Sequence, residues 1–173
     1  MMEETIVNRV AGSALQTVDL SEYLDKSESV DFDMSQGLFQ GLVLKEKEFR
    51  QFVKDFDWTQ YTNKNVTVHC SADAIIPSWA YMLVASKLEN IVHLMTFGTK
   101  DDLEKLRVDL AIDKLLLQDL SNAKVVIKGC GNLENRDYAY FELAKRLVPV
   151  VSSLMYGEPC STVPVYKKPK EKS

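Results

Sequence analysis

Three cysteines are the residues of this chain whose type and placement could support thiol or metal chemistry. Cys70 ends one apolar segment, Cys130 follows a second, and Cys160 follows a third within Gly157-Glu158-Pro159-Cys160. If these segments are parallel strands of one sheet, all three thiols lie at its carboxyl edge, where open α/β folds bind ligands. Thiolates bind zinc and iron–sulfur clusters. The pattern suggests a site of Cys70, Cys130 and Cys160, with Asp73 as a fourth ligand.

A purely structural role for the cysteines stays open. Free cysteine behaves as a small buried apolar residue in many proteins. The long spacings between the three cysteines match no metal-site signature, and no C-x-x-C motif occurs. A cytoplasmic chain keeps its thiols reduced, so we expect no disulfide. The identity of any metal stays unknown at this point.

The turn after Cys70 is a second place where chemistry is possible. It joins a strand end to the start of a helix, where free backbone N–H groups and the helix dipole attract anions. The residues of this anion-binding turn would be Ser71, Ala72, Asp73 and Ser78. Asp73 suits a metal ligand or a general base, but an aspartate here more often bonds the loop backbone or caps the helix. No residue is identified as catalytic.

Hydrophobic periodicity predicts the elements that would position these residues. Apolar residues spaced as on one helix face favour a helix over 45–56, and apolar runs favour buried strands. The expected helices are 4–11, 45–56, 77–89, one from Thr99 through Leu110, and one from Asp137 to before Pro149; the expected strands are 15–20, 30–34, 66–70, 91–97, 124–127 and 150–156. Alternating strands and helices predict a three-layer α/β sandwich. Its mixed sheet would have a parallel core and an antiparallel N-terminal edge.

Part of the chain resembles another part. Residues 66–98 align without a gap with residues 125–157, with seven identities in 33 positions. An internal repeat is one explanation, and the shared hydrophobic pattern of any two βαβ units is the other. The helix near 79–88 is apolar on almost all sides, which favours a contact with another subunit.

Length and charge limit the classes of protein. A chain of 173 residues fits one domain, expected over 1–166, with a disordered basic tail over 167–173. The net charge of −4 argues against nucleic-acid binding. No apolar run reaches the length of a membrane span, and the acidic start is unlike a secretory signal. We expect a cytoplasmic protein that binds neither nucleic acid nor membrane.

Several segments resemble one uncharacterised bacterial family, domain of unknown function 2480. The most specific is Cys70-Ser71-Ala72-Asp73-Ala74-Ile75-Ile76-Pro77-Ser78-Trp79-Ala80-Tyr81; others are Asn8-Arg9-Val10-Ala11, Leu44-Lys45-Glu46-Lys47, Ile127-Lys128-Gly129-Cys130 and Gly157-Glu158-Pro159-Cys160-Ser161-Thr162-Val163-Pro164. The resemblance covers nearly the whole chain. It implies no activity or catalytic residue, and it suggests a setting near iron–sulfur assembly proteins.

Three functional hypotheses follow. The first is a thiol-based accessory in iron–sulfur or sulfur metabolism, whose three cysteines would hold zinc or an iron–sulfur cluster. The second is a non-enzymatic interaction module, forming a homodimer through the repeat and its aromatic helices. The third is an enzyme that binds a small anion or metabolite at the 70–79 turn. Whether the protein is an enzyme stays undecided by the sequence.

Overall fold

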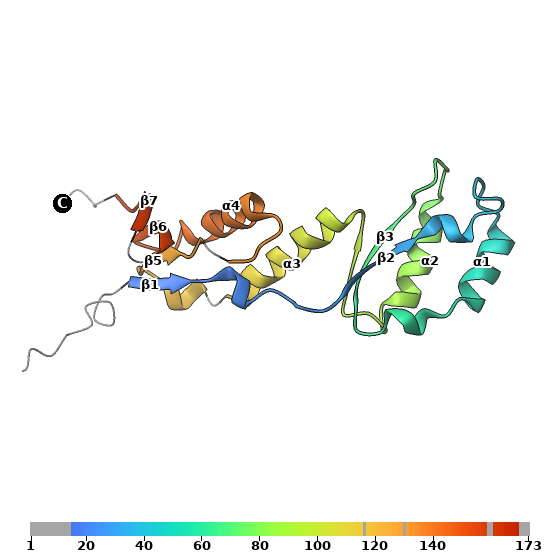
Figure 1. Cartoon of the computed structure of the whole chain (residues 1–173), viewed down its shortest axis with the longest axis horizontal. Coiled ribbons are helices and arrows are strands. Elements are labelled where there is room, and N and C mark those ends of the chain that lie inside the picture. Colours follow the sequence, from blue (N-terminus) through green and yellow to red (C-terminus); the bar gives the residue numbers. More distant parts are fainter. Residues whose placement is uncertain (1–14, 116, 130, 159–160, 170–173) are drawn as a thin grey trace, which may run out of the picture. The chain divides into compact units, whose positions relative to one another are not determined.

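The computed structural model describes residues 15–115, 117–129, 131–158 and 161–169. The chain divides into two compact units (Figure 1). We call Asp25–Arg107 the central unit, and Met1–Leu24 together with Val108–Ser173 the terminal unit. The single domain expected over 1–166 stays a prediction, because two such units can still belong to one domain.

The central unit is built on a three-stranded parallel sheet. Its order is β2-β3-β4, with strands β2 (Ser29–Asp33), β3 (Asn65–His69) and β4 (Leu94–Phe97). Helices α1 (Glu46–Asp55) and α2 (Ser78–Leu88) supply the connections, because parallel strands need a crossover. The 3₁₀ helices η2 (Met34–Gly37) and η3 (Trp58–Tyr61) complete the unit. One buried cluster joins sheet and helices, with Phe32, Phe49, Val53, Val66, Val84 and Leu88 at its centre.

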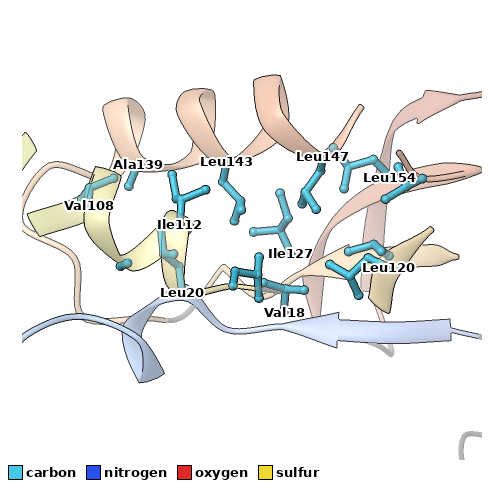
Figure 2. Close-up of a cluster of buried hydrophobic side chains, with 14 of the residues drawn as sticks. Val18, Leu20, Val108, Ile112, Leu120, Ile127, Ala139, Leu143, Leu147 and Leu154 are labelled. Carbon is cyan, nitrogen blue, oxygen red and sulfur yellow. The ribbon is translucent and has the colours of Figure 1, made fainter. Parts of the chain in front are cut away.

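The terminal unit has a four-stranded sheet of order β1-β5-β6-β7. Strands β1 (Leu15–Val18), β5 (Lys124–Ile127) and β6 (Ser153–Glu158) are parallel, and β7 (Ser161–Lys167) runs antiparallel to β6. Helix α4 (Arg136–Leu147) and the part of α3 (Lys100–Lys114) from Val108 onward pack on the sheet. Figure 2 shows Leu143 and Leu147 of α4 pointing toward the strand residues Val18 and Ile127. The short 3₁₀ helix η1 (Leu20–Glu22) follows β1 in the sequence, and η4 (Leu117–Leu120) lies between α3 and β5.

The mixed α/β class with a parallel core is confirmed, while two details of the predicted sheet are wrong. The strands form two sheets rather than one sheet in a three-layer sandwich. The antiparallel pair lies at the C-terminal edge, between β6 and β7, whereas the N-terminal strands β1 and β2 are both parallel to their neighbours. Strand pairing depends on contacts far apart in sequence, which local patterns do not encode.

Two predictions about the ends of the chain extend beyond the residues that the structure describes. The helix expected over 4–11 lies outside them. The stretch predicted as a tail, 167–173, begins inside β7, and the backbone N–H of Lys168 donates to the carbonyl of Ser152 at 2.9 Å. Residues 170–173 lie outside the described range. Among the described residues, no helix combines the length and apolar character that a membrane span needs.

Several structural features occur at equivalent positions in the two aligned segments, 66–98 and 125–157. Others occur just before the two segments, at positions that the same offset makes equivalent. Asn63 and Asn122 both have a positive φ of 57°, and each donates its backbone N–H, to Ile91 and to Val150 respectively. The strand registers also correspond, since Val68 pairs with Phe97 and Ile127 pairs with Tyr156. The internal repeat stays a prediction, and these details are the structural observations that bear on it.

Candidate functional site

An apolar groove lies between helix α2 and the outer strand of the central sheet. We call it the β4 groove. It has a volume of about 280 Å³ and is lined by Val68, Tyr81, Met82, Ala85, Met95, Thr96 and Phe97. Met82 and Phe97 are each 70% exposed, although both are large apolar residues. Burial, together with the nearby Cys70 and Asp33, raises the pKa of Tyr81 above its ordinary value.

The local sequence explains why the groove is apolar. Ala80, Val84 and Leu88 occupy the buried side of α2, while Met82 lies on the opposite side of the same helix. Since α2 is apolar on both sides, its outward face presents hydrophobic atoms to solvent. The Phe97 ring meets the Tyr81 ring edge to face, with centroids 5.0 Å apart. This contact fixes the position of an otherwise exposed aromatic ring.

Strand β4 has an open outer edge in the part of the chain that the structure describes. It ends the order β2-β3-β4, and its four residues, Leu94 to Phe97, carry no charge. Exposed edges in native proteins are commonly blocked by charges or proline. Strand β2 has Asp31 and Asp33, and β7 has Pro164 and Lys167, whereas β4, like the edge strand β1 of the terminal sheet, has no such residue. The β4 edge therefore remains able to pair with another strand.

The terminal unit contains a hollow that corresponds to the β4 groove. Its volume is about 320 Å³, and its lining residues are Ile127, Asp137, Tyr140, Ala144, Leu154, Tyr156 and Val165. Most of these residues are equivalent to a β4-groove residue in the alignment of the two segments; the pairs are Val68/Ile127, Tyr81/Tyr140, Ala85/Ala144, Met95/Leu154 and Phe97/Tyr156. Here β7 pairs with the outer edge of β6, and its Val165 lines the hollow. The same kind of edge is thus covered in one unit and open in the other.

The anion-binding turn predicted after Cys70 is engaged with a carboxylate of the chain itself. Ser71 donates its backbone N–H to Asp33 Oδ1 at 3.0 Å and its hydroxyl to Asp33 Oδ2 at 2.5 Å. The backbone N–H of Ser35 donates to Asp33 Oδ1 at 2.9 Å. Burial by itself would raise the pKa of Asp33, but the hydrogen bonds from Ser71 and Ser35 outweigh it and lower the pKa far below its ordinary value.

The remaining residues of the predicted turn, Ala72, Asp73 and Ser78, are not part of this contact with Asp33. The Ala72 carbonyl accepts hydrogen bonds from the Cys70 thiol at 3.6 Å and from the Ala74 N–H at 2.9 Å. The Asp73 and Ser78 residues are exposed. The interpretation of Asp73 as a helix cap is wrong, because the N-cap residue of α2 is Pro77, which makes no side-chain cap hydrogen bond.

The three cysteines do not follow strands of a single sheet. Cys70 is half-buried after β3 in the central sheet, whereas β5 and β6, which precede Cys130 and Cys160 in sequence, belong to the terminal sheet. The premise of one common sheet edge is therefore wrong. Cys130 and Cys160 lie outside the described residues, so the three-cysteine site itself, with its iron–sulfur partners, stays a prediction. Within the described ranges, no three His, Cys, Asp or Glu side chains are grouped to hold a metal ion.

Replacing Asp33 with asparagine is predicted to change how stability depends on pH. A lowered carboxyl pKa stabilises the fold above the unfolded pKa of about 3.9, and this stabilisation is lost as pH falls toward the folded pKa. We expect Asp33→Asn to be less stable than the wild type at pH 7, with the difference shrinking as pH falls below about 4. Urea denaturation at several pH values measures this. The exposed Asp73→Asn is the control, and a wild-type advantage over Asp33→Asn that is independent of pH would contradict the prediction.

Comparison with known proteins identifies the chain at the level of family. A family model described as "Protein of unknown function (DUF2480)" matches residues 4–168. Neither the comparison with curated proteins nor the comparison with solved structures found a match. Because the match extends over nearly the entire chain, this protein belongs to the DUF2480 family.

Proposed function

We propose that this protein is a non-enzymatic interaction module that forms a homodimer through the β4 groove and the open edge of β4. The observation that carries the proposal is the exposure of Met82 and Phe97, each 70%, beside an uncharged edge strand. Exposed apolar side chains that line a common hollow are typical of interaction surfaces, whereas single scattered ones are not.

The pairing of β6 with β7 supplies a template for this contact. In that pair an antiparallel strand adds to an outer edge, and Tyr156 lies opposite Val163. Phe97 occupies the position in β4 that Tyr156 occupies in β6, because Phe97 pairs with Val68 and Tyr156 pairs with the equivalent Ile127. An antiparallel strand added to β4 would therefore cover Phe97 in the same way and satisfy the free backbone groups of the edge.

A second copy of the chain is the occupant that fits this edge. Two β4 strands related by a two-fold axis run antiparallel, so one surface serves both partners. Such pairing joins two three-stranded sheets into one continuous sheet and places a Met82 and a Phe97 from each copy in the contact. Because Leu94-Met95-Thr96-Phe97 contains no charge, the two identical edges do not repel each other.

The double variant Met82→Lys/Phe97→Lys tests the proposal. We expect the wild type to sediment as a dimer at micromolar concentration and the variant as a monomer. Burial of each apolar side chain contributes about 1.5–3 kcal/mol, so four lysine charges in the contact, two from each copy, should weaken dimerisation by roughly 100-fold or more. Both residues are 70% exposed, so the substitutions leave the folded core intact. Analytical ultracentrifugation over a range of concentrations measures the dissociation constant.

Two matched variants serve as controls. Phe141→Lys changes a residue of α4 that is 69% exposed and is equivalent to Met82 in the alignment of the two segments. Ile75→Lys changes a 93% exposed residue outside the groove. Both should remain dimers. A monomeric wild type, or a dimer that the double variant retains at unchanged affinity, would overturn the proposal.

A further inference from the structure

A hollow rich in lysine lies at one end of the terminal sheet. We call it the lysine hollow. Its volume is about 520 Å³, and it is lined by Lys124, Ser152, Ser153, Leu154, Met155, Pro164, Tyr166, Lys167, Lys168 and Pro169. Lys124 begins β5, Ser153 begins β6, and Lys167 ends the antiparallel β7, so three strand ends meet at this point. The hollow is thus made by segments that are well separated in the sequence.

Strand register brings the lysines together. Ser153 pairs with Lys124 on one side and with Lys167 on the other. Residues in one such row share a face of the sheet, and neighbouring strands are about 4.8 Å apart, so Lys124 and Lys167 stand about 10 Å apart on either side of Ser153. Their flexible side chains can reach the same bound group. Lys168 follows directly and adds a third cation to the hollow.

The charges of these three lysines are not neutralised by ion pairs within the described part of the fold. Some other lysines of the chain form ion pairs, such as Lys64 with Glu28 at 2.9 Å and Lys145 with Glu142 at 2.5 Å. Lys124, Lys167 and Lys168 form none with any residue that the structure describes, and no acidic residue among those described lines the hollow. Three positive charges therefore gather on a chain whose net charge is −4.

The floor of the hollow is apolar. Met155 lies two residues beyond Ser153 on β6, so both side chains point to the same face of the sheet. Met155 pairs with Pro164 of β7, and Pro169 adds further apolar surface. The hollow thus combines a cationic rim with an apolar floor. Its volume lies within the range of small-molecule sites, about 300–1,000 Å³.

We propose that the lysine hollow binds a small organic polyanion. The anionic groups of the ligand, phosphates or carboxylates, bind Lys124, Lys167 and Lys168, and the Ser153 hydroxyl supplies a neutral donor. The apolar part of the ligand packs on Met155 and Pro164. This site lies within the terminal unit and involves no residue of the β4 groove, so it stands independently of the homodimer.

Isothermal titration calorimetry with three probes tests the site. ATP without magnesium represents an organic phosphate, citrate an organic carboxylate, and inorganic triphosphate an anion without an apolar part. We expect ATP or citrate to bind the full-length wild type at low salt, with affinity that falls in about 0.3 M KCl because salt screens the lysine charges. Lys124→Gln/Lys167→Gln should weaken this binding by roughly tenfold or more, since two of three cations are removed.

The double variant Lys54→Gln/Lys114→Gln is the matched control, because it removes two exposed lysines that do not line the hollow. It should bind the probes as the wild type does, and thermal melts should show both variants folded. Which organic probe binds identifies the anionic group. The absence of binding by ATP and citrate, or equal weakening in both double variants, would overturn the proposal. Inorganic triphosphate that binds as tightly as ATP would overturn the role of the apolar floor.

Discussion

Replacing Phe32 with alanine is expected to lower the free energy of unfolding of the central unit by about 3–5 kcal/mol. The Phe32 side chain is completely buried in the cluster that joins β2, β3 and both helices. Its ring centroid lies 5.1 Å from that of Trp58, 5.5 Å from that of Phe56 and 6.0 Å from that of Tyr61. Alanine leaves a cavity among rigid aromatic rings, which cannot collapse to fill it.

Urea denaturation followed by tryptophan fluorescence measures this loss, because Trp58 belongs to the same cluster. Phe97→Ala is the matched control in the same unit, since it makes the same chemical change at a residue that is 70% exposed. We expect the control to cost less than about 1 kcal/mol in the monomer. Equal losses in the two variants would show that Phe32 is not the centre of the central core.

The substitution Gly157→Ala is expected to lower the free energy of unfolding by about 3 kcal/mol and to loosen β7 from β6. Gly157 has a φ of +126°, a conformation that residues with a side chain rarely adopt. A Cβ at this position would also lie 2.5 Å from the backbone carbonyl oxygen of Ser161. Since that oxygen belongs to the neighbouring strand, relief of the clash requires the β6–β7 pairing to shift.

Hydrogen exchange of the β7 amides, together with chemical denaturation, tests this expectation. The control is Gly41→Ala, because Gly41 also has a positive φ, +72°, but a Cβ there meets no atom within 4 Å. We expect the control to lower the free energy of unfolding by about 1 kcal/mol, because only the conformational cost of a side chain at positive φ applies there. Unchanged protection of the β7 amides in Gly157→Ala would contradict the proposed role of this glycine in the β6–β7 pairing.

The helices of this protein are predictable because their signals are local. The apolar spacing of Phe49, Phe52, Val53 and Phe56 predicts a helix over 45–56, and the structure has α1 at Glu46–Asp55. The helix expected over 77–89 is α2, Ser78–Leu88. Such patterns depend on neighbours three and four residues apart, which a single stretch of sequence contains in full.

Strand pairing is harder to predict. Strand β1 pairs with β5, and Leu15 near the start of the chain lies opposite Lys124 in its last third. Strand β7 is unexpected from the sequence, because Pro164 and a basic end favour a loop or tail; an edge strand tolerates proline where an inner strand does not. Both features depend on which segments meet after folding.

The candidate sites also combine a feature that the sequence predicts with features that depend on the tertiary structure. The apolar character of α2 on almost all sides is by itself a sequence signal of a contact surface. Met95 and Phe97, in contrast, belong to a segment whose composition is typical of a strand buried on both faces. Only the position of β4 at the end of its sheet leaves Phe97 exposed. Lys124 and Lys167 carry no sequence signal of a common site, because register alone places them on either side of Ser153.

The amino-acid sequence by itself determined the type and approximate bounds of most elements, the α/β class with a parallel core, and the family. The tertiary structure alone decided that the strands form two sheets, that β7 covers β6 while β4 stays open, and that three lysines meet at one hollow. The physical reason is that helix and strand periodicity arises within a few residues, whereas an apolar strand can pair with many others. Which pairing occurs is set by the packing of the complete chain.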